Sequence, residues 1–135
     1  MTLTDAGPLV ALVDRSQPDN ARCRASLAQL PTPMVTTWPA FAEAMYLLGR
    51  IGGWPLQRNL WQYVVEEVLE FYALTTFDQL RMKALMEQYR DRPMDMADAS
   101  LVAAAEATGE MRIFTIDRDF YIYQRHGSEP FEVIP

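Results

Sequence analysis

Short apolar runs alternate along the chain with longer segments in which apolar residues recur at helical spacing. The short runs occupy residues 1–4, 34–36, 68–74, 112–116 and 131–134. Strands that are buried on both faces of a parallel sheet are apolar almost throughout, as these runs are. We therefore predict five strands, with a further short strand or turn at 120–123.

Helical spacing fills the segments between the strands. It predicts helices at 8–13, 21–30, 38–50, 56–67, 77–89 and 96–108. Thr37 can cap the third, Thr75 or Thr76 the fifth and Asp95 the sixth, which Gly109 ends. Strands that alternate with helices imply βαβ units and a mainly parallel sheet covered on both faces. The expected architecture is α/β, in a single domain spanning residues 1–135.

Composition narrows the setting of the protein. The chain has 135 residues, 50% of them hydrophobic, which is ample for one core. No stretch approaches the roughly 20 apolar residues of a membrane span, and the N-terminus lacks the pattern of a signal peptide. The single cysteine, Cys23, excludes an intrachain disulfide and a cysteine-rich zinc site. We expect a soluble cytoplasmic protein without a membrane segment.

Four acids lie where a predicted strand ends or a predicted helix begins: Asp5, Glu43, Asp98 and Asp117. Open α/β sheets place their sites at the carboxyl ends of strands, so these acids are expected to share one site. Like charges repel at close range, and such a cluster usually needs a cation. The first hypothesis is a divalent-metal phosphodiesterase.

Each acid also has a purely structural interpretation. Asp5 can cap a helix, Asp98 stands in a first turn that favours anions, and Asp117 or Asp119 can be a solvated loop acid. Glu43 is the hardest to explain in this way, because its helix is apolar on nearly all sides. The only histidine, His126, has no matching base or nucleophile partner and is expected at the surface. A chain without further histidines supports zinc poorly, and hard oxygen ligands favour Mg²⁺ or Mn²⁺.

The net charge of −6 counts against nucleic-acid binding, since phosphate binders are usually basic. The four acids carry −4 of this charge, and bound cations would offset them, so the acidic balance weakens such a function without excluding it. Arg15, Arg50 and Arg118 are candidates to hold a phosphate backbone, and the sequence does not choose among them.

The context of the acids resembles a known family. Four segments carry the resemblance: residues 4–12, 36–44, 94–102 and 114–120. In this order they resemble PIN-domain ribonucleases, in particular the VapC toxins of bacterial toxin–antitoxin pairs. The resemblance implies a three-layer α/β/α sandwich with a mainly parallel five-stranded sheet. Pro8, which follows Gly7, and the presence of both Asp117 and Asp119 depart from the usual pattern.

The resemblance also implies a site and partners. Asp5, Glu43, Asp98 and Asp117 fall on the family's acidic metal-binding positions, Asp95 and Asp119 on accessory ones, and Thr115 on a supporting hydroxyl. The implied activity is hydrolysis of single-stranded RNA with Mg²⁺ or Mn²⁺. The implied partners are a small antitoxin and a second copy of the chain.

Two other functions are open from the sequence. An inactive PIN-like scaffold that acts through protein partners would explain the acidic balance, although it has no reason to keep unpaired carboxylates together. A phosphotransferase centred on Asp117-Arg118-Asp119 would need companion motifs that the chain lacks.

Overall fold

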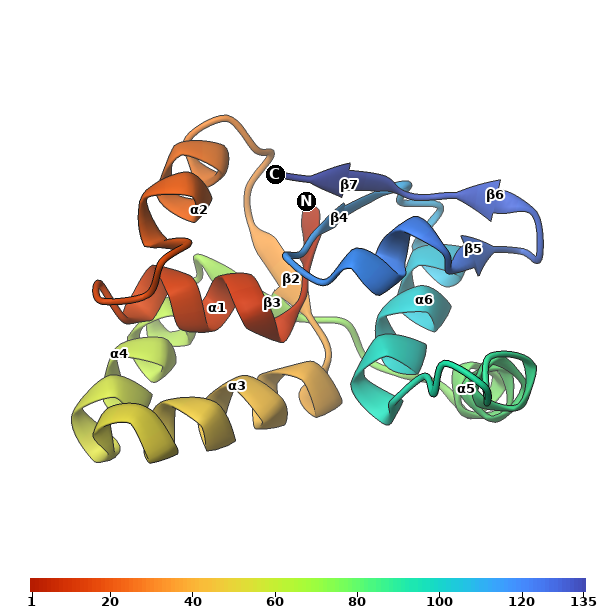
Figure 1. Cartoon of the computed structure of the whole chain (residues 1–135), viewed down its shortest axis with the longest axis horizontal. Helices are drawn as coiled ribbons and strands as arrows, with labels where there is room; N and C mark the ends of the chain where they lie inside the picture. Colours follow the sequence, from red (N-terminus) through yellow and green to blue (C-terminus); the bar gives the residue numbers. More distant parts are fainter.

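The computed structural model describes residues 1–135 and is built around one five-stranded parallel sheet (Figure 1). The strands are β1 (Thr2–Thr4), β2 (Met34–Thr36), β3 (Leu69–Phe71), β4 (Arg112–Phe114) and β7 (Glu132–Ile134). They lie in the order β3-β2-β1-β4-β7, and every neighbouring pair is parallel. The order places β1 at the centre, so that residues directly after β1 and β4 meet at one edge of the sheet.

Helices cover both faces of this sheet. They are α1 (Ala6–Val13), α2 (Asn20–Leu27), α3 (Trp38–Gly52), α4 (Trp54–Val65), α5 (Thr76–Gln88) and α6 (Met96–Thr108). Helices α1, α3 and α4 pack together, as do α5 and α6 (Figure 1). The three-layer α/β/α arrangement expected from the sequence is confirmed.

The alternation of side chains along the strands divides the core in two. Leu3, Val35 and Ile113 point into the cluster built around α6, and Met34 and Phe114 point into the cluster on the other face. Successive side chains of a strand face opposite ways, so β2 and β4 contribute to both cores.

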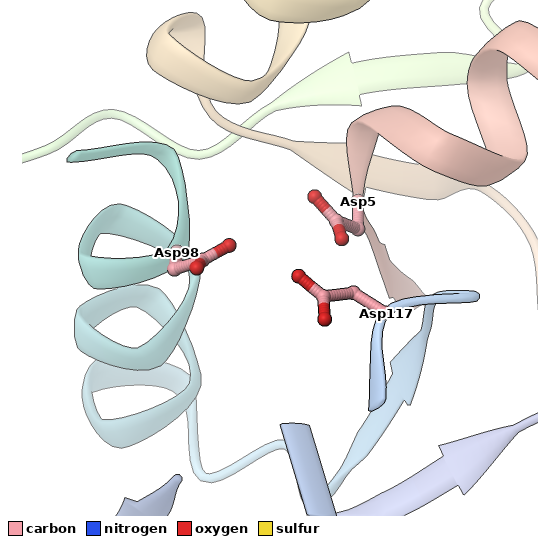
Figure 2. Close-up of side chains that lie close together, drawn as sticks. All are labelled: Asp5, Asp98 and Asp117. Atoms are coloured by element: carbon pink, nitrogen blue, oxygen red, sulfur yellow. The ribbon is translucent and has the colours of Figure 1, made fainter. Parts of the chain in front are cut away.

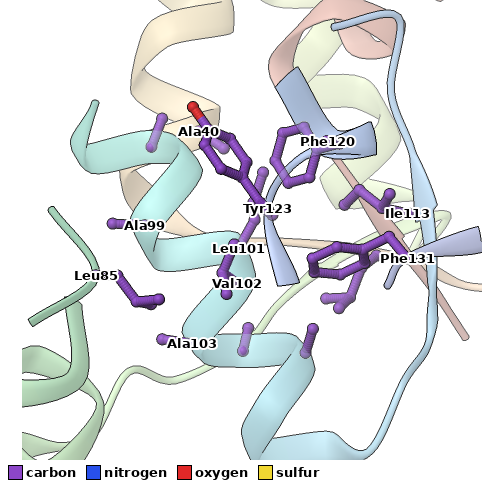
Figure 3. Packing of buried hydrophobic residues seen from close by; sticks show 14 of the residues in the cluster. Ala40, Leu85, Ala99, Leu101, Val102, Ala103, Ile113, Phe120, Tyr123 and Phe131 are labelled. Atoms are coloured by element: carbon purple, nitrogen blue, oxygen red, sulfur yellow. The ribbon is translucent and has the colours of Figure 1, made fainter. Parts of the chain in front are cut away.

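Helix α6 is the most enclosed element of the structure. Every residue from Ala97 to Ala105 is buried. Small alanine side chains let the helix lie close to its neighbours, and Leu101 and Val102 fill the space toward Phe120 and Phe131 (Figure 3). Asp98 is therefore fixed in place by a helix with little room to move.

The caps expected from the sequence are present. The side chains of Thr37, Thr75 and Asp95 each accept a hydrogen bond from the first turn of the following helix. Gly109 ends α6 with φ of 75°, a left-handed conformation that glycine adopts without strain. None of the helices combines the length and the apolar composition needed to cross a membrane.

Several boundaries differ from the prediction. Helix α1 begins at Ala6 rather than Pro8, because Asp5 caps it and a proline is tolerated in a first turn. Strand β3 is only three residues long, since its one neighbour, β2, is equally short. Both ends of β2 and of α6 agree with the prediction, and the ends that differ elsewhere shift by one to three residues, as expected where only the local pattern sets them.

The region after β4 was predicted least well. In place of a short strand or turn at 120–123, a 3₁₀ helix, η1 (Arg118–Tyr121), follows β4. It leads into an antiparallel hairpin of β5 (Gln124–Arg125) and β6 (Glu129–Pro130), which was not predicted. Strands of two residues carry too little periodicity to be detected.

Candidate metal centre

Three carboxylates converge at the carboxyl edge of the sheet (Figure 2). Asp5 follows β1, Asp117 follows β4, and Asp98 reaches toward them from the first turn of α6. One oxygen of each lies within 4.8 Å of the others. The sequence placed these residues at element ends, and the parallel order of β1 and β4 brings two of the three together.

Asp5 is held from two sides. Its Oδ1 accepts the backbone N–H of Ala6 at 2.7 Å, and its Oδ2 accepts the hydroxyl of Thr115 at 2.8 Å. The hydroxyl oxygen of Thr115 in turn accepts the N–H of Asp117 at 3.0 Å. Burial raises the pKa of Asp5 to about 6, against the lowering effect of these bonds. Thr115 thus links two of the three acids.

Asp98 has an instructive counterpart in Asp78. Each is the third residue of its helix, each follows a capping residue, and the two are 6% and 3% exposed. Asp78 accepts the N–H of Thr75 at 2.9 Å and the hydroxyl of Tyr72 at 2.8 Å. Burial acts to raise the pKa of Asp78, but these hydrogen bonds outweigh it and the pKa is lowered. Asp78 is a satisfied capping residue.

Asp98 is not satisfied in this way. The only hydrogen bond that its side chain accepts comes from the hydroxyl of Tyr123, at 3.0 Å. Burial, followed by the charges of Asp95 and Asp5, raises the pKa of Asp98 to about 8. A carboxylate in the same helical position as Asp78, yet pointed at two other acids, serves no capping purpose.

Glu43 and Asp95 complete the rim of this site. A cavity of about 250 Å³ is lined by five acids: Asp5, Glu43, Asp95, Asp98 and Asp117. Burial, then the charges of Asp95, Asp5 and Asp117, raises the pKa of Glu43. Its carboxylate is not part of the closest group of three.

The reason the sequence suggested for Glu43 was wrong. Helix α3 is apolar on nearly all sides, but much of this apolar surface is exposed, including Tyr46 at 61% and Ile51 at 47%. Glu43 is half-buried at the edge of the acidic cavity and does not need a buried partner.

Asp119 lies outside the cluster. Its backbone N–H donates to Oδ1 of Asp117 at 2.9 Å, while its own carboxylate lies 3.5 Å from Arg92. The structure brings Asp117 to the acidic cavity and leaves Asp119 paired with an arginine.

Tyr123 was missed by the sequence reasoning. Tyr123 is fully buried, and its hydroxyl donates a hydrogen bond to Asp98. Burial, followed by the charge of Asp98, raises the pKa of Tyr123 well above its ordinary value. The available signal was a tyrosine in an otherwise apolar position shortly after the last acidic motif. Only the packing of η1 against α6 shows where its hydroxyl points (Figure 3).

The donor set suits a hard divalent cation. All three converging ligands are carboxylates, while His126 is exposed beside Glu106 and Cys23 is buried in α2. Two of the acids hold raised pKa values, so the cluster is unfavourable when fully ionised without a cation. Oxygen-only coordination favours Mg²⁺ or Mn²⁺ over zinc.

Comparison with known proteins identifies the family. The model of the PIN domain family matches residues 2–125, so the chain belongs to that family. No curated protein matches the sequence significantly. The resemblance expected from the four acidic segments is confirmed.

Two solved structures are similar in fold. The crystal structure of Mycobacterium tuberculosis VapC20, a toxin that cleaves the sarcin–ricin loop, matches with a TM-score of 0.85 and 17% identity, over 96% of this chain and 100% of that one. FitAcB from Neisseria gonorrhoeae matches with a TM-score of 0.57 and 17% identity, over 87% of this chain and 88% of that one. At these identities the similarity shows the fold.

Proposed function

We propose that this protein is a Mg²⁺- or Mn²⁺-dependent endoribonuclease that hydrolyses phosphodiester bonds of single-stranded RNA, and that it is the toxin of a toxin–antitoxin pair. The observation that carries the proposal is the convergence of Asp5, Asp98 and Asp117 within 4.8 Å at the carboxyl edge of a PIN-domain sheet. The similarity in fold to VapC20, a sarcin–ricin loop cleaving toxin, supports RNA as the substrate.

The side chains divide the work as follows. Asp5, Asp98 and Asp117 hold the cation, with Thr115 orienting Asp5 and Tyr123 orienting Asp98. When bound, a divalent ion stabilises negative charge on a scissile phosphate and lowers the pKa of water. Glu43, at the rim of the cavity, orients the attacking water and can accept its proton.

The experiment is cleavage of a fluorophore–quencher single-stranded RNA by purified protein, with Mn²⁺, with Mg²⁺ and with EDTA. We expect cleavage only with metal, and its loss in Asp5→Asn. Asp78→Asn is the matched control, since it alters a buried first-turn carboxylate outside the cluster. Absence of cleavage with either metal would overturn the proposal.

The inactive scaffold is the second candidate, motivated by the acidic net charge of −6. Calorimetric titration with Mn²⁺ separates the two functions. A saturable site that disappears in Asp5→Asn supports the nuclease, whereas no saturable site supports the scaffold.

The proposed partners are a small antitoxin that covers the acids and a second copy of the chain, in the cytoplasm. Supporting them is the apolar surface that the protein exposes on α3 and α4: Trp38, Tyr46, Leu47, Ile51, Trp54, Trp61 and Val65. Surfaces of this kind commonly mark protein contacts. Light scattering of the purified chain tests the dimer. Co-expression with a small reading frame directly upstream tests the antitoxin.

A further inference from the structure

A larger cavity adjoins the acidic one. It has a volume of about 630 Å³, and its lining includes Arg22, Thr115, Asp117, Arg118 and Tyr121. Ile116 and Asp117 line both cavities, so the two meet at these residues. The volume lies within the roughly 300–1,000 Å³ typical of ligand pockets. We refer to this larger cavity as the arginine cleft.

The cationic side chains of the arginine cleft are available for a ligand. Arg118 is exposed and takes part in none of the protein's salt bridges. Arg22 has a single ion pair, with Asp19 at 3.9 Å, and both side chains are well exposed. Exposed pairs of this length contribute little stability, so Arg22 can exchange Asp19 for a phosphate at little cost.

Tyr121 adds an aromatic face to the arginine cleft. It is 65% exposed, although it belongs to η1, whose neighbouring residue Phe120 is fully buried. An exposed aromatic ring beside arginines is the combination that binds single-stranded nucleic acid, in which bases stack on the ring and phosphates pair with the cations.

The opposite flank of the acids offers nothing comparable. There the acidic cavity is lined by Glu43, Leu47 and Asp95, and no basic residue lines it. A phosphate backbone leaving the metal centre on that side would meet further negative charge. The arginine cleft, which begins at Asp117 and also contains Asp19, is the flank that offers cationic side chains, those of Arg22 and Arg118.

The same geometry chooses among the three arginines that the sequence left open. Arg15 lines separate cavities together with Leu12 and Tyr63. Arg50 lies over the ring of Tyr46 on α3, with its guanidinium carbon 5.9 Å from the ring centre. Of these three arginines, only Arg118 lines the cavity that adjoins the acids.

We infer that the arginine cleft binds the stretch of single-stranded RNA immediately next to the scissile phosphate. Arg118 and Arg22 hold its phosphates, and Tyr121 stacks on one base. This inference rests on the proposed ribonuclease function and names the substrate-binding surface of the same site. Stacking tolerates every base, so the arginine cleft contributes affinity and direction rather than base selection.

The test uses a short fluorescent single-stranded RNA and protein in which Asp5→Asn blocks cleavage. Binding is followed by anisotropy at several salt concentrations. We expect Arg118→Gln to reduce the slope of log affinity against log salt by about 0.7, the value for one lost contact to a single strand. Tyr121→Leu should weaken binding by about 5- to 150-fold, corresponding to the roughly 1–3 kcal/mol of one stacked base, and leave the slope unchanged.

The controls are Arg90→Gln and Phe77→Leu, which alter an exposed arginine and an exposed aromatic residue outside the arginine cleft. Both should bind RNA as the parent does. In the otherwise wild-type protein, Arg118→Gln should raise KM for cleavage with little change in kcat, and titration with Mn²⁺ should be unaltered.

The outcomes separate the two proposals. If wild-type protein neither binds nor cuts RNA with Mn²⁺, the ribonuclease function and the arginine cleft both fail. If it cuts RNA but Arg118→Gln and Tyr121→Leu bind like the controls, only the arginine cleft is overturned. Unaltered RNA binding together with loss of a co-expressed protein partner would assign this surface to protein recognition instead, and would also overturn the inference.

Discussion

Replacing Asp98 by asparagine should stabilise the metal-free protein and at the same time abolish its metal binding. Asn has nearly the same size and can still accept the hydrogen bond from Tyr123. What the change removes is the need either to bury a negative charge close to those of Asp5 and Asp117 or to bind a proton in its place. Asp98→Asn therefore tests whether the cluster is held together against its own repulsion.

The size of the effect follows from the pKa of Asp98, which is raised from 3.8 to about 8. A shift of this size corresponds to an upper limit of about 6 kcal/mol, at roughly 1.4 kcal/mol per pKa unit. Solvent reaches the open side of the cluster and screens the charges, which reduces the expected gain to about 2 kcal/mol. For a chain of this length the gain corresponds to a rise in Tm of roughly 8 °C.

The gain should depend on pH with a defined sign. Between pH 4 and pH 8 the unfolded protein has lost the proton of Asp98 while the folded protein retains it, so wild-type stability falls as pH rises. The fall ends at the folded-state pKa, for which about 8 is the upper limit and which screening of the cluster brings down. The variant lacks this titration, so its advantage should grow from near zero at pH 4 by up to roughly 1.4 kcal/mol per pH unit, reach about 2 kcal/mol within about two pH units, and stay there to pH 8.

The assay is thermal unfolding of both proteins in EDTA across this pH range, repeated with Mn²⁺. Mn²⁺ at about 100 times its Kd should stabilise the wild type by about 2.7 kcal/mol and the variant hardly at all, which cancels or reverses the difference. Asp78→Asn is the control. It weakens two accepted hydrogen bonds and should cost about 1–2 kcal/mol at every pH above 4. If Asp98→Asn also destabilises the protein in EDTA at pH 8, Asp98 is an ordinary capping residue and the reasoning is refuted.

Three further outcomes are expected at the same site. Mn²⁺ affinity should rise about tenfold per pH unit between the pKa of Asp5, about 6, and that of Asp98, about 8, because Asp98 must release one proton when the ion binds. Calorimetry in two buffers of different ionisation enthalpy counts that proton, and an affinity that does not depend on pH would contradict this expectation. Tyr123→Phe removes a hydrogen bond that lowers the pKa of Asp98, so Mn²⁺ binding by this variant should weaken and shift to higher pH. If Tyr123 had only a structural role, the substitution would lower Tm without moving the pH profile of Mn²⁺ binding. Thr115→Val breaks the link between Asp5 and Asp117 and should reduce Mn²⁺ affinity, measured by titration, by about 10- to 100-fold. If the hydroxyl had only a packing role, the affinity would not fall.

Much of the fold could be predicted from local patterns. Helix α6 was predicted with its exact bounds, because alanine-rich apolar spacing, the Asp95 cap and the terminal Gly109 all indicate the same segment. The hairpin of β5 and β6 was not predicted, since strands of two residues lie below the length at which periodicity has meaning.

The sequence also proposed which acids would meet, but it did so from their positions at element ends and from family resemblance. The local helical pattern alone does not separate Asp98, which the resemblance selected, from Asp78. Both are acids in the first turn of a capped helix, and their pKa values shift in opposite directions because of what lies across from each in space. Asp78 faces hydrogen-bond donors and Asp98 faces other carboxylates.

By itself, then, the sequence determined the class of fold, because strand and helix periodicities depend only on nearby residues, and it determined the set of acids from which a site could be built. Tertiary structure decided the rest. The parallel pairing of β1 with β4 joined Asp5 to Asp117, the packing of η1 turned the Tyr123 hydroxyl toward Asp98, and the cavity beside the acids brought Arg118 together with Arg22. Each of these is a meeting of residues far apart in the chain, which no local pattern encodes.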